Sequence, residues 1–449
     1  MKTVIEQSKL EPSSDKRKQF DYIKFKVKEF CRKKSIELAK INKENMKSLE
    51  HKIKCAQERL QIDPTNIEIH QQLSDAQNSL DGHYQRIHKG LVLKSRTQYY
   101  EEGEKCTQFF LNSIKNNTNK TTIRQIKLNE SSQIIDDPSL IMDELGSFYK
   151  TLYTSQREPE MYTFMEAETW IQDLKNRELI PQLSEDDIEL LSKNLELEDL
   201  EAALKTTSPN KSPGNDGLPY EFYTHFWSEI KDPLFESLNE GLSEGELSTS
   251  QRQSTIRLIP KKDKDLLFIK NWRPLNQSNC DNKLLARVFA FLLLLVIDKL
   301  IHPSQVAYIR NRYIGEGIRT IEGIIEYLRE NNLEGYLLSI DFEKAFDSLE
   351  WDYLWLVLEA FGFPLVFINK IKVMYKNIEA CVLNDGTSTM YFTLSRCIKQ
   401  GCPLSGLLFI LAIELLLIRI RHEQTVQGIV VRNTEIKASA YADDVVNFL

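Results

Sequence analysis

Three carboxylates in the C-terminal part of the sequence lie at the ends of short apolar runs. Asp341 comes directly after the run 336–340, and Asp443 and Asp444 separate the runs 438–442 and 445–449. Carboxylates so placed can hold two Mg²⁺ ions about 3.5–4 Å apart, which activate a hydroxyl and stabilise the leaving oxygens of an in-line phosphoryl displacement. This chemistry requires Asp341 and Asp443 to converge. Taken singly, such residues are more often a helix cap or a solvated turn.

Two other segments could contact a nucleotide. The basic cluster 261–265 follows a short alternating strand, 254–260, and precedes the Trp-Arg-Pro sequence at 272–274. Such a cluster is usually a solvated turn and less often a triphosphate cradle. The Gly-Cys-Pro loop at 401–403 runs into an apolar helix, and it can bring backbone close to a planar or phosphate ligand. Alone, it indicates only a helix start.

The elements that must position these residues follow from hydrophobic periodicity. We expect 336–340 and 437–448 to lie in one sheet, because the first strand delivers Asp341 and the second segment is a hairpin with the Asp-Asp pair at its tip. Near the N-terminus, apolar residues recur at three- to four-residue spacing from 35 to 60 and again from 67 to Asp81-Gly82. With the break at 63–66, this pattern predicts a helical hairpin.

Composition excludes several classes of protein. The 449 residues are 41% hydrophobic and 27% charged, which is typical of a folded chain. The seven cysteines contain no CxxC pair, which argues against a disulfide framework or a zinc finger and favours a reducing compartment. The start of the chain lacks the apolar core of a signal peptide, and the apolar run 288–297 is about half the length of a membrane span. We expect a nuclear or cytoplasmic protein that is not secreted and has no membrane contact.

Charge is distributed unevenly along the chain. Residues 1–60 carry 17 Lys and Arg against 9 Asp and Glu, whereas residues 121–250 carry 10 against 27. The basic N-terminal part is equally consistent with a solvated helix face and with a nucleic-acid or nuclear-import patch. We expect it to give weak, salt-sensitive binding of RNA or DNA, and its helices to contact a partner protein.

Five blocks in order carry a family resemblance: SPGNDGLP, NWRP, SIDFEKAFD, KQGCPLS and YADD, spread over 207–449. Together they resemble the reverse transcriptase domain of a non-LTR retrotransposon of the long interspersed element type. The segment 100–110, YEEGEKCTQFF, is similar to the sequence that precedes this domain in such elements, so the resemblance extends back to about residue 94. Just before KQGCPLS, Cys397 stands where the family has glycine. A side chain in place of a glycine that the backbone requires costs of order 1 kcal/mol.

The resemblance implies an α/β fold, the fingers and palm of a right-hand polymerase, preceded by a largely helical N-terminal region. It divides the chain into a helical, partly basic extension at 1–150, an acidic connection at 151–206, a fingers-like part at 207–334 and a palm-like part at 335–449. The chain ends five residues after Asp444, before the family's thumb. We therefore expect a C-terminally truncated domain that is incomplete as a polymerase.

The resemblance also assigns roles to residues. The catalytic and metal ligands would be Asp341, Asp443 and Asp444, with Mg²⁺ or Mn²⁺ as cofactor, and the substrates an RNA template, a DNA primer or target, and dNTP. Substrate binding would fall to Lys262 and Arg273 near the triphosphate, Phe346 as an aromatic gate against the ribose 2′-hydroxyl, and Gln400 with Gly401 near the template and nucleotide. The alternative is a non-catalytic retroelement remnant that at most binds nucleic acid or a partner. A nucleotide cyclase also pairs carboxylates on strands, but KQGCPLS speaks against it.

Overall fold

The computed structural model describes residues 1–10, 14–95, 122–128, 134–155 and 162–449. The segment 100–110 that contributed to the family resemblance lies outside the described residues. The chain divides into two compact units: one holds residues 25–123 with Met1, and the other holds 2–24 and 124–449. The domain boundaries expected from the sequence remain predictions.

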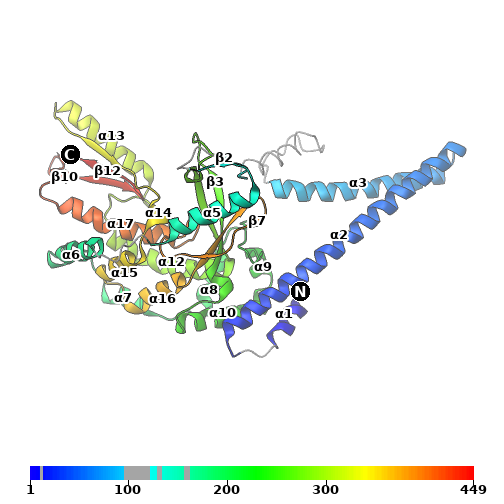
Figure 1. Cartoon of the computed structure of the whole chain (residues 1–449), viewed down its shortest axis with the longest axis horizontal. Helices are drawn as coiled ribbons and strands as arrows, with labels where there is room; N and C mark the ends of the chain where they lie inside the picture. The colour runs from blue at the N-terminus through cyan, green and yellow to red at the C-terminus, as the bar shows by residue number, and fades with distance from the viewer. Residues whose placement is uncertain (11–13, 96–121, 129–133, 156–161) are drawn as a thin grey trace. The chain divides into compact units, whose positions relative to one another are not determined.

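The smaller unit is built on two long helices, α2 (Lys16–Ile62) and α3 (Ile67–Ser95), which run back along each other (Figure 1). The first residues of α2 belong to the larger unit. The side chain of Asn66 accepts hydrogen bonds from the backbone N–H groups of Glu68 and Ile69, so it caps α3. The predicted helical hairpin is confirmed.

The predicted end of the second helix at Asp81-Gly82 was wrong, because α3 continues to Ser95. A glycine inside a helix costs about 1 kcal/mol relative to alanine, and the helix formers on both sides of Gly82 outweigh that cost. The space around Gly82 is open. No close contact therefore explains this glycine.

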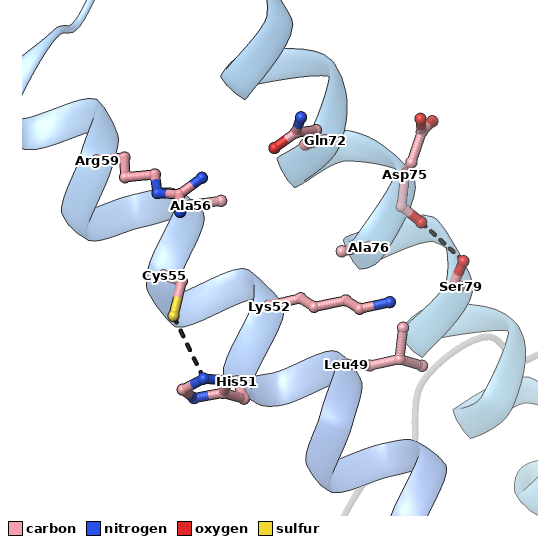
Figure 2. A pocket seen from close by; sticks show the side chains of 10 residues that line it. All are labelled: Leu49, His51, Lys52, Cys55, Ala56, Arg59, Gln72, Asp75, Ala76 and Ser79. Atoms are coloured by element: carbon pink, nitrogen blue, oxygen red, sulfur yellow. Dashed lines mark hydrogen bonds between the residues drawn. The ribbon is translucent and has the colours of Figure 1, made fainter.

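A shallow cavity of about 520 Å³ lies between α2 and α3, where Ala56 and Ala76 are buried. Figure 2 shows its lining: Lys52 extends from α2 toward α3, and the His51 and Cys55 side chains contact each other at 3.5 Å on α2. Small residues at the contact let the two helices approach closely.

The larger unit contains the remaining helices and all the described strands. Its helices are α1 (Lys2–Lys9), α5 (Pro138–Tyr153), α6 (Tyr162–Asn176), α7 (Glu185–Ser192), α8 (Leu197–Lys205), α9 (Tyr220–His225), α10 (Trp227–Ser243), α11 (Thr249–Arg252), the 3₁₀ turn η1 (Ile269–Asn271), α12 (Cys280–Leu300), α13 (Ile314–Glu330), α14 (Ala345–Ser348), α15 (Trp351–Ala360), α16 (Leu365–Tyr375) and α17 (Ser405–His422). None of the helices in the described part of the chain combines the length and apolar character needed to cross a bilayer.

The described strands of this unit form four sheets. They are β1 (Ile126–Lys127), β2 (Ile134–Ile135), β3 (Gln253–Pro260), β4 (Trp272–Ser278), β5 (Leu337–Ile340), β6 (Glu379–Asn384), β7 (Thr387–Ser388), β8 (Phe392–Thr393), β9 (Ile429–Val431), β10 (Thr434–Ile436), β11 (Ala438–Tyr441) and β12 (Asp444–Phe448). A five-stranded sheet has the order β4-β3-β6-β7 with β8 also on β6, and a three-stranded sheet has the order β11-β12-β5. The hairpins β1-β2 and β9-β10 each form a separate two-stranded sheet.

The three-stranded sheet joins segments that are distant in sequence. Strand β12 pairs antiparallel with both β11 and β5, so 336–340 and 437–448 share one sheet, as predicted. Helix α13 lies beside this sheet (Figure 1). A small core of Ile324 from α13, Ile429 and Phe448 fills the space beneath the helix. Burial of these apolar side chains stabilises the sheet that carries the predicted carboxylates.

Two apolar helices form the centre of the larger unit. Helix α12 contains the run 288–297, and α17 follows the Gly-Cys-Pro loop; both bury most of their apolar side chains and they contact each other. The fold is thus a mixed α/β domain preceded by a helical N-terminal region, which confirms the predicted fold class.

Candidate active site

The three predicted metal ligands come from the three-stranded sheet. Val445 pairs with Ile340, so Asp341, the residue after β5, comes level with Asp444 at the start of β12. Tyr441 pairs with Asp444 across the hairpin, which leaves residues 442 and 443 as a two-residue turn. The sheet therefore brings the end of β5 beside the turn that carries Asp443.

The charges of Asp341 and Asp444 act on the carboxyl group of Asp443. Asp443 is half-buried, whereas Asp341 and Asp444 are exposed. The pKa of the Asp443 carboxyl is raised, first by burial and then by the negative charges of Asp444 and Asp341, while the charge of Arg273 opposes the rise. Mutual repulsion of this kind is relieved when a cation binds.

The donor atoms of this group fit a divalent ion. Carboxylate oxygens are the ligands that Mg²⁺ and Mn²⁺ prefer. Among the described residues, no three His, Cys, Asp or Glu side chains stand close enough to hold a metal ion together. The exposed side chains of Asp341 and Asp444 would therefore have to turn toward Asp443 to share one ion with it.

Phe346 is held by an aromatic stack. Its ring lies 4.6 Å from the ring of Phe409 on α17, at an interplanar angle of 12°. Its backbone carbonyl accepts a hydrogen bond from the N–H of Ile398, at 2.8 Å. Such packing fixes the ring at the start of α14, close along the chain to Asp341.

Gln400 and Gly401 lie against strand β4. The carbonyl of Gln400 accepts a hydrogen bond from the Asn276 N–H at 3.0 Å. Gly401 has φ +98°, and a Cβ there would lie 3.3 Å from the carbonyl oxygen of Asn276. Glycine is needed at this position because both the backbone conformation and the close approach disfavour a side chain. Cys397, in the same loop, has φ +101°, so it occupies a backbone conformation that suits the glycine of the family pattern.

Asp347 is a buried residue to which the sequence analysis assigned no role. It is 4% exposed, and its carboxylate accepts hydrogen bonds from the Tyr153 hydroxyl at 3.0 Å and from Nε2 of Gln400 at 3.1 Å. It therefore orients the Gln400 side chain. The only sequence signal was its place in the SIDFEKAFD block, six residues after Asp341, because both partners are distant in sequence.

The ionisation of Asp347 predicts a pH dependence of stability. Burial raises its pKa to about 6, against the opposing effects of the Tyr153 hydrogen bond and the charge of Lys344. Between about pH 4 and 6 the folded chain thus binds more protons here than the unfolded chain, so stability should fall as pH rises, by at most about 1.4 kcal/mol per pH unit. In Asp347→Asn this contribution should disappear from the free energy of unfolding measured by urea denaturation across that range.

The matched control for this measurement is Asp232→Asn, at an exposed position of α10. It should leave the pH slope of the wild type in place. If Asp347→Asn and wild type show the same slope, the carboxyl of Asp347 does not titrate as expected.

The two predicted triphosphate cations lie on β4 and in the connection between β3 and β4. Arg273 is exposed on β4, opposite Ile259 of β3, and Lys262 is exposed in the loop that follows β3. The charge of Arg273 reaches Asp443. Arg273 therefore interacts electrostatically with Asp443. For Lys262 we have only its position in the loop after β3.

Asn279 holds part of the SPGNDGLP loop on α12. A Cβ on Gly214 would lie 2.1 Å from Oδ1 of Asn279, so glycine is required at this contact. The same Oδ1 accepts a hydrogen bond from the backbone N–H of Asp216 at 3.2 Å. The loop therefore packs directly on the start of α12.

A buried ion cluster joins this loop to the first turns of α2. Nζ of Lys24 lies 2.7 Å from Asp281 Oδ2 and 3.4 Å from Asp216 Oδ2, and all three side chains are buried. In the sequence, Lys24 is one of the 17 Lys and Arg residues of the basic N-terminal part. The structure buries it, so Lys24 is not available to bind a nucleic acid at the surface.

Comparisons with known proteins found one matching family and several similar proteins. Residues 259–449 match the family described as reverse transcriptase (RNA-dependent DNA polymerase). The chain is 34% identical over 364 residues to the transposon TX1 uncharacterized 149 kDa protein of Xenopus laevis, which covers 81% of this chain and 27% of that protein. It is 28% identical over 249 residues to a retrovirus-related Pol polyprotein from the type-1 retrotransposable element R2 of Popillia japonica, covering 55% of this chain and 34% of that protein. The chain thus spans about a third or less of the length of these relatives.

Proposed function

This chain carries a domain of the reverse transcriptase family, of the kind found in non-LTR retrotransposons, and we propose that the domain copies RNA into DNA by two-metal nucleotidyl transfer. The observation that carries the proposal is the sheet register. It brings Asp341 beside Asp444 and the turn that holds Asp443, although the two segments are far apart in sequence.

We assign the divalent ions to these three carboxylates. Bound there, Mg²⁺ or Mn²⁺ would supply activation of the primer hydroxyl and charge stabilisation at the phosphate under attack. The pKa of the Asp443 carboxyl is raised first by burial and then by the charges of Asp444 and Asp341. A bound cation would relieve the repulsion among these charges, which supports the assignment.

Arg273 and Lys262 would bind the triphosphate of the incoming nucleotide. Both side chains are exposed, Arg273 on β4 and Lys262 in the loop after β3, and the charge of Arg273 acts on the Asp443 carboxyl. A fixed guanidinium suits a phosphate because it can donate two parallel hydrogen bonds.

Phe346 would select the sugar, and Gln400 with Gly401 would position template and nucleotide. A gate against the ribose 2′-hydroxyl needs a ring that does not move, and the stack on Phe409 supplies that rigidity. The amide of Gln400 is oriented by Asp347, and Gly401 leaves the backbone open to close approach.

A single-nucleotide extension assay tests the proposal. The full chain is mixed with an RNA template annealed to a DNA primer, Mg²⁺ and the complementary dNTP, and addition of one nucleotide is measured. The addition of one nucleotide does not require processive copying, so we expect it from wild type even if the domain is incomplete, and none from Asp341→Asn. In Phe346→Ala the use of the matching ribonucleotide should rise relative to dNTP.

The control is Phe342→Ala, which removes an aromatic side chain of the same block outside the stack. It should leave the choice between ribonucleotide and dNTP unchanged. If wild type adds no nucleotide, or if Asp341→Asn adds as much as wild type, the catalytic proposal fails and a non-catalytic remnant is the better interpretation.

A further inference from the structure

The hairpin turn that presents the carboxylates has an unusual backbone conformation. Its first residue, Ala442, has φ +54°, in the left-handed region that residues other than glycine rarely adopt. The residue is 3% exposed, so solvent does not satisfy its backbone groups. Something in the protein must hold this turn.

The amide of Gln305 satisfies both backbone groups of Ala442. Its Oε1 accepts a hydrogen bond from the Ala442 N–H at 2.9 Å, and its Nε2 donates to the Ala442 carbonyl at 3.3 Å. Oε1 also accepts from the N–H of Ala307 at 3.1 Å. Gln305 is 0% exposed. One buried side chain thus fixes the peptide groups on both sides of the left-handed residue.

The backbone of Gln305 is fixed as firmly as its side chain. The segment 304–306 runs parallel to β11: the Ala440 N–H donates to the Ser304 carbonyl at 2.8 Å, and the Val306 N–H donates to the Ala440 carbonyl at 3.0 Å. The Gln305 carbonyl accepts from Nη1 of Arg312 at 2.8 Å. The amide therefore approaches the turn from an anchored strand-like segment.

Both hydrogen bonds to Ala442 require a primary amide on a side chain as long as that of glutamine. It must accept from the Ala442 N–H and donate to the Ala442 carbonyl at once, and a carboxylate could not donate. A buried polar group that loses its partner is destabilising, so the network requires all its members.

The two hydrogen bonds between Gln305 and Ala442 affect the carboxylates because Asp443 and Asp444 directly follow Ala442. Loss of the left-handed conformation of Ala442 would change the directions of both side chains. We infer that Gln305 is a positioning residue, which holds the left-handed turn so that Asp443 and Asp444 face a shared divalent cation. This inference rests on the proposed function.

The test measures Mn²⁺ binding by the full chain, with free Mn²⁺ followed by electron paramagnetic resonance. Gln305→Met keeps the side-chain length and removes the amide. We expect it to weaken Mn²⁺ binding by about 10-fold or more, as loss of a group that orients a metal ligand typically does. Adding Ala442→Gly should restore part of the affinity for Mn²⁺, because glycine adopts the left-handed conformation without the hydrogen bonds from Gln305.

The matched control is Gln251→Met, at another glutamine that is 0% exposed and hydrogen-bonded, in the cap of α11. It should reduce stability without weakening Mn²⁺ binding. If Gln305→Met does not fold, Gln305→Asn, which keeps the amide on a shorter arm, should give a smaller loss in the same direction. If wild type binds Mn²⁺ and both Gln305 variants bind it equally well, the positioning role is overturned. If wild type itself binds no Mn²⁺, the proposed metal site fails, and the inference with it.

Discussion

Replacing Lys24 with Met should lower the free energy of unfolding by about 3–5 kcal/mol, the range found when one partner of a buried ion pair is removed. Nζ of Lys24 is 2.7 Å from Asp281, and both side chains are almost completely inaccessible. Burial alone would lower the pKa of Lys24, but the charges of Asp281 and Asp216 outweigh it and raise the pKa. The lysine is therefore charged and required as a counter-ion. The measurement is a urea or guanidinium unfolding curve of the full chain.

Two further variants sharpen this experiment. Lys18→Met, on the same helix, removes a cation whose side chain is 81% exposed and should change stability by less than about 0.5 kcal/mol. Adding Asp281→Asn and Asp216→Asn to Lys24→Met should recover part of the loss, because the unpaired buried charges are then gone. Equal effects of the Lys18 and Lys24 changes would show that the ion cluster does not hold the start of α2 on the domain.

Changing Asp443 to Asn should move stability and activity in opposite directions. Without divalent ions the variant should melt slightly above wild type, because it removes a carboxylate whose pKa is raised by burial and by its acidic neighbours. Above the unfolded-state pKa, near 4, the ionised carboxyl of Asp443 destabilises the folded wild type. The variant is therefore more stable than wild type at pH 7, and this difference vanishes in acid, where the carboxyl is neutral.

Activity should fall by roughly 100-fold or more in the same variant. A catalytic metal stabilises the transition state by several kcal/mol, and a change of about 1.4 kcal/mol in the activation free energy changes the rate tenfold. Mg²⁺ should raise the melting temperature of wild type and raise that of Asp443→Asn much less. Asp385→Asn is the matched control, since Asp385 is an exposed acidic residue in another hairpin turn with positive φ. A variant at 443 that melts below wild type and responds equally to Mg²⁺ would argue against carboxylate repulsion and metal binding there.

The sequence predicted those parts of the site that depend on local pattern. The strand before Asp341, the hairpin around Asp443 and the helix after Gly401 follow from apolar runs and turn residues, and the structure contains all three. That the strand and the hairpin share a sheet was also predicted and is confirmed. The roles of these residues stay predictions, because they concern ligands.

The supporting residues could not be read from the sequence. Lys24 stands among many surface lysines, and only tertiary structure places it between Asp216 and Asp281. Gln305 and Asp347 likewise act on partners distant in the chain. Periodicity reports which face of an element is buried, whereas the partner of a buried polar group depends on how distant segments meet.

The parallel pairing of β3 with β6 has a consequence for how the protein is made. The two strands meet from Gln253 opposite Glu379 onward, a separation of 126 residues. At about 5–20 residues per second of synthesis, β3 must wait roughly 6–25 s for its neighbour β6 to be made. During that interval one edge of β3, a strand with Ile256 and Leu258 in the eventual core, offers unpaired backbone to other chains. Slowed translation between these strands should therefore favour aggregation of the nascent chain, whereas chaperones that cover strand edges should raise its yield.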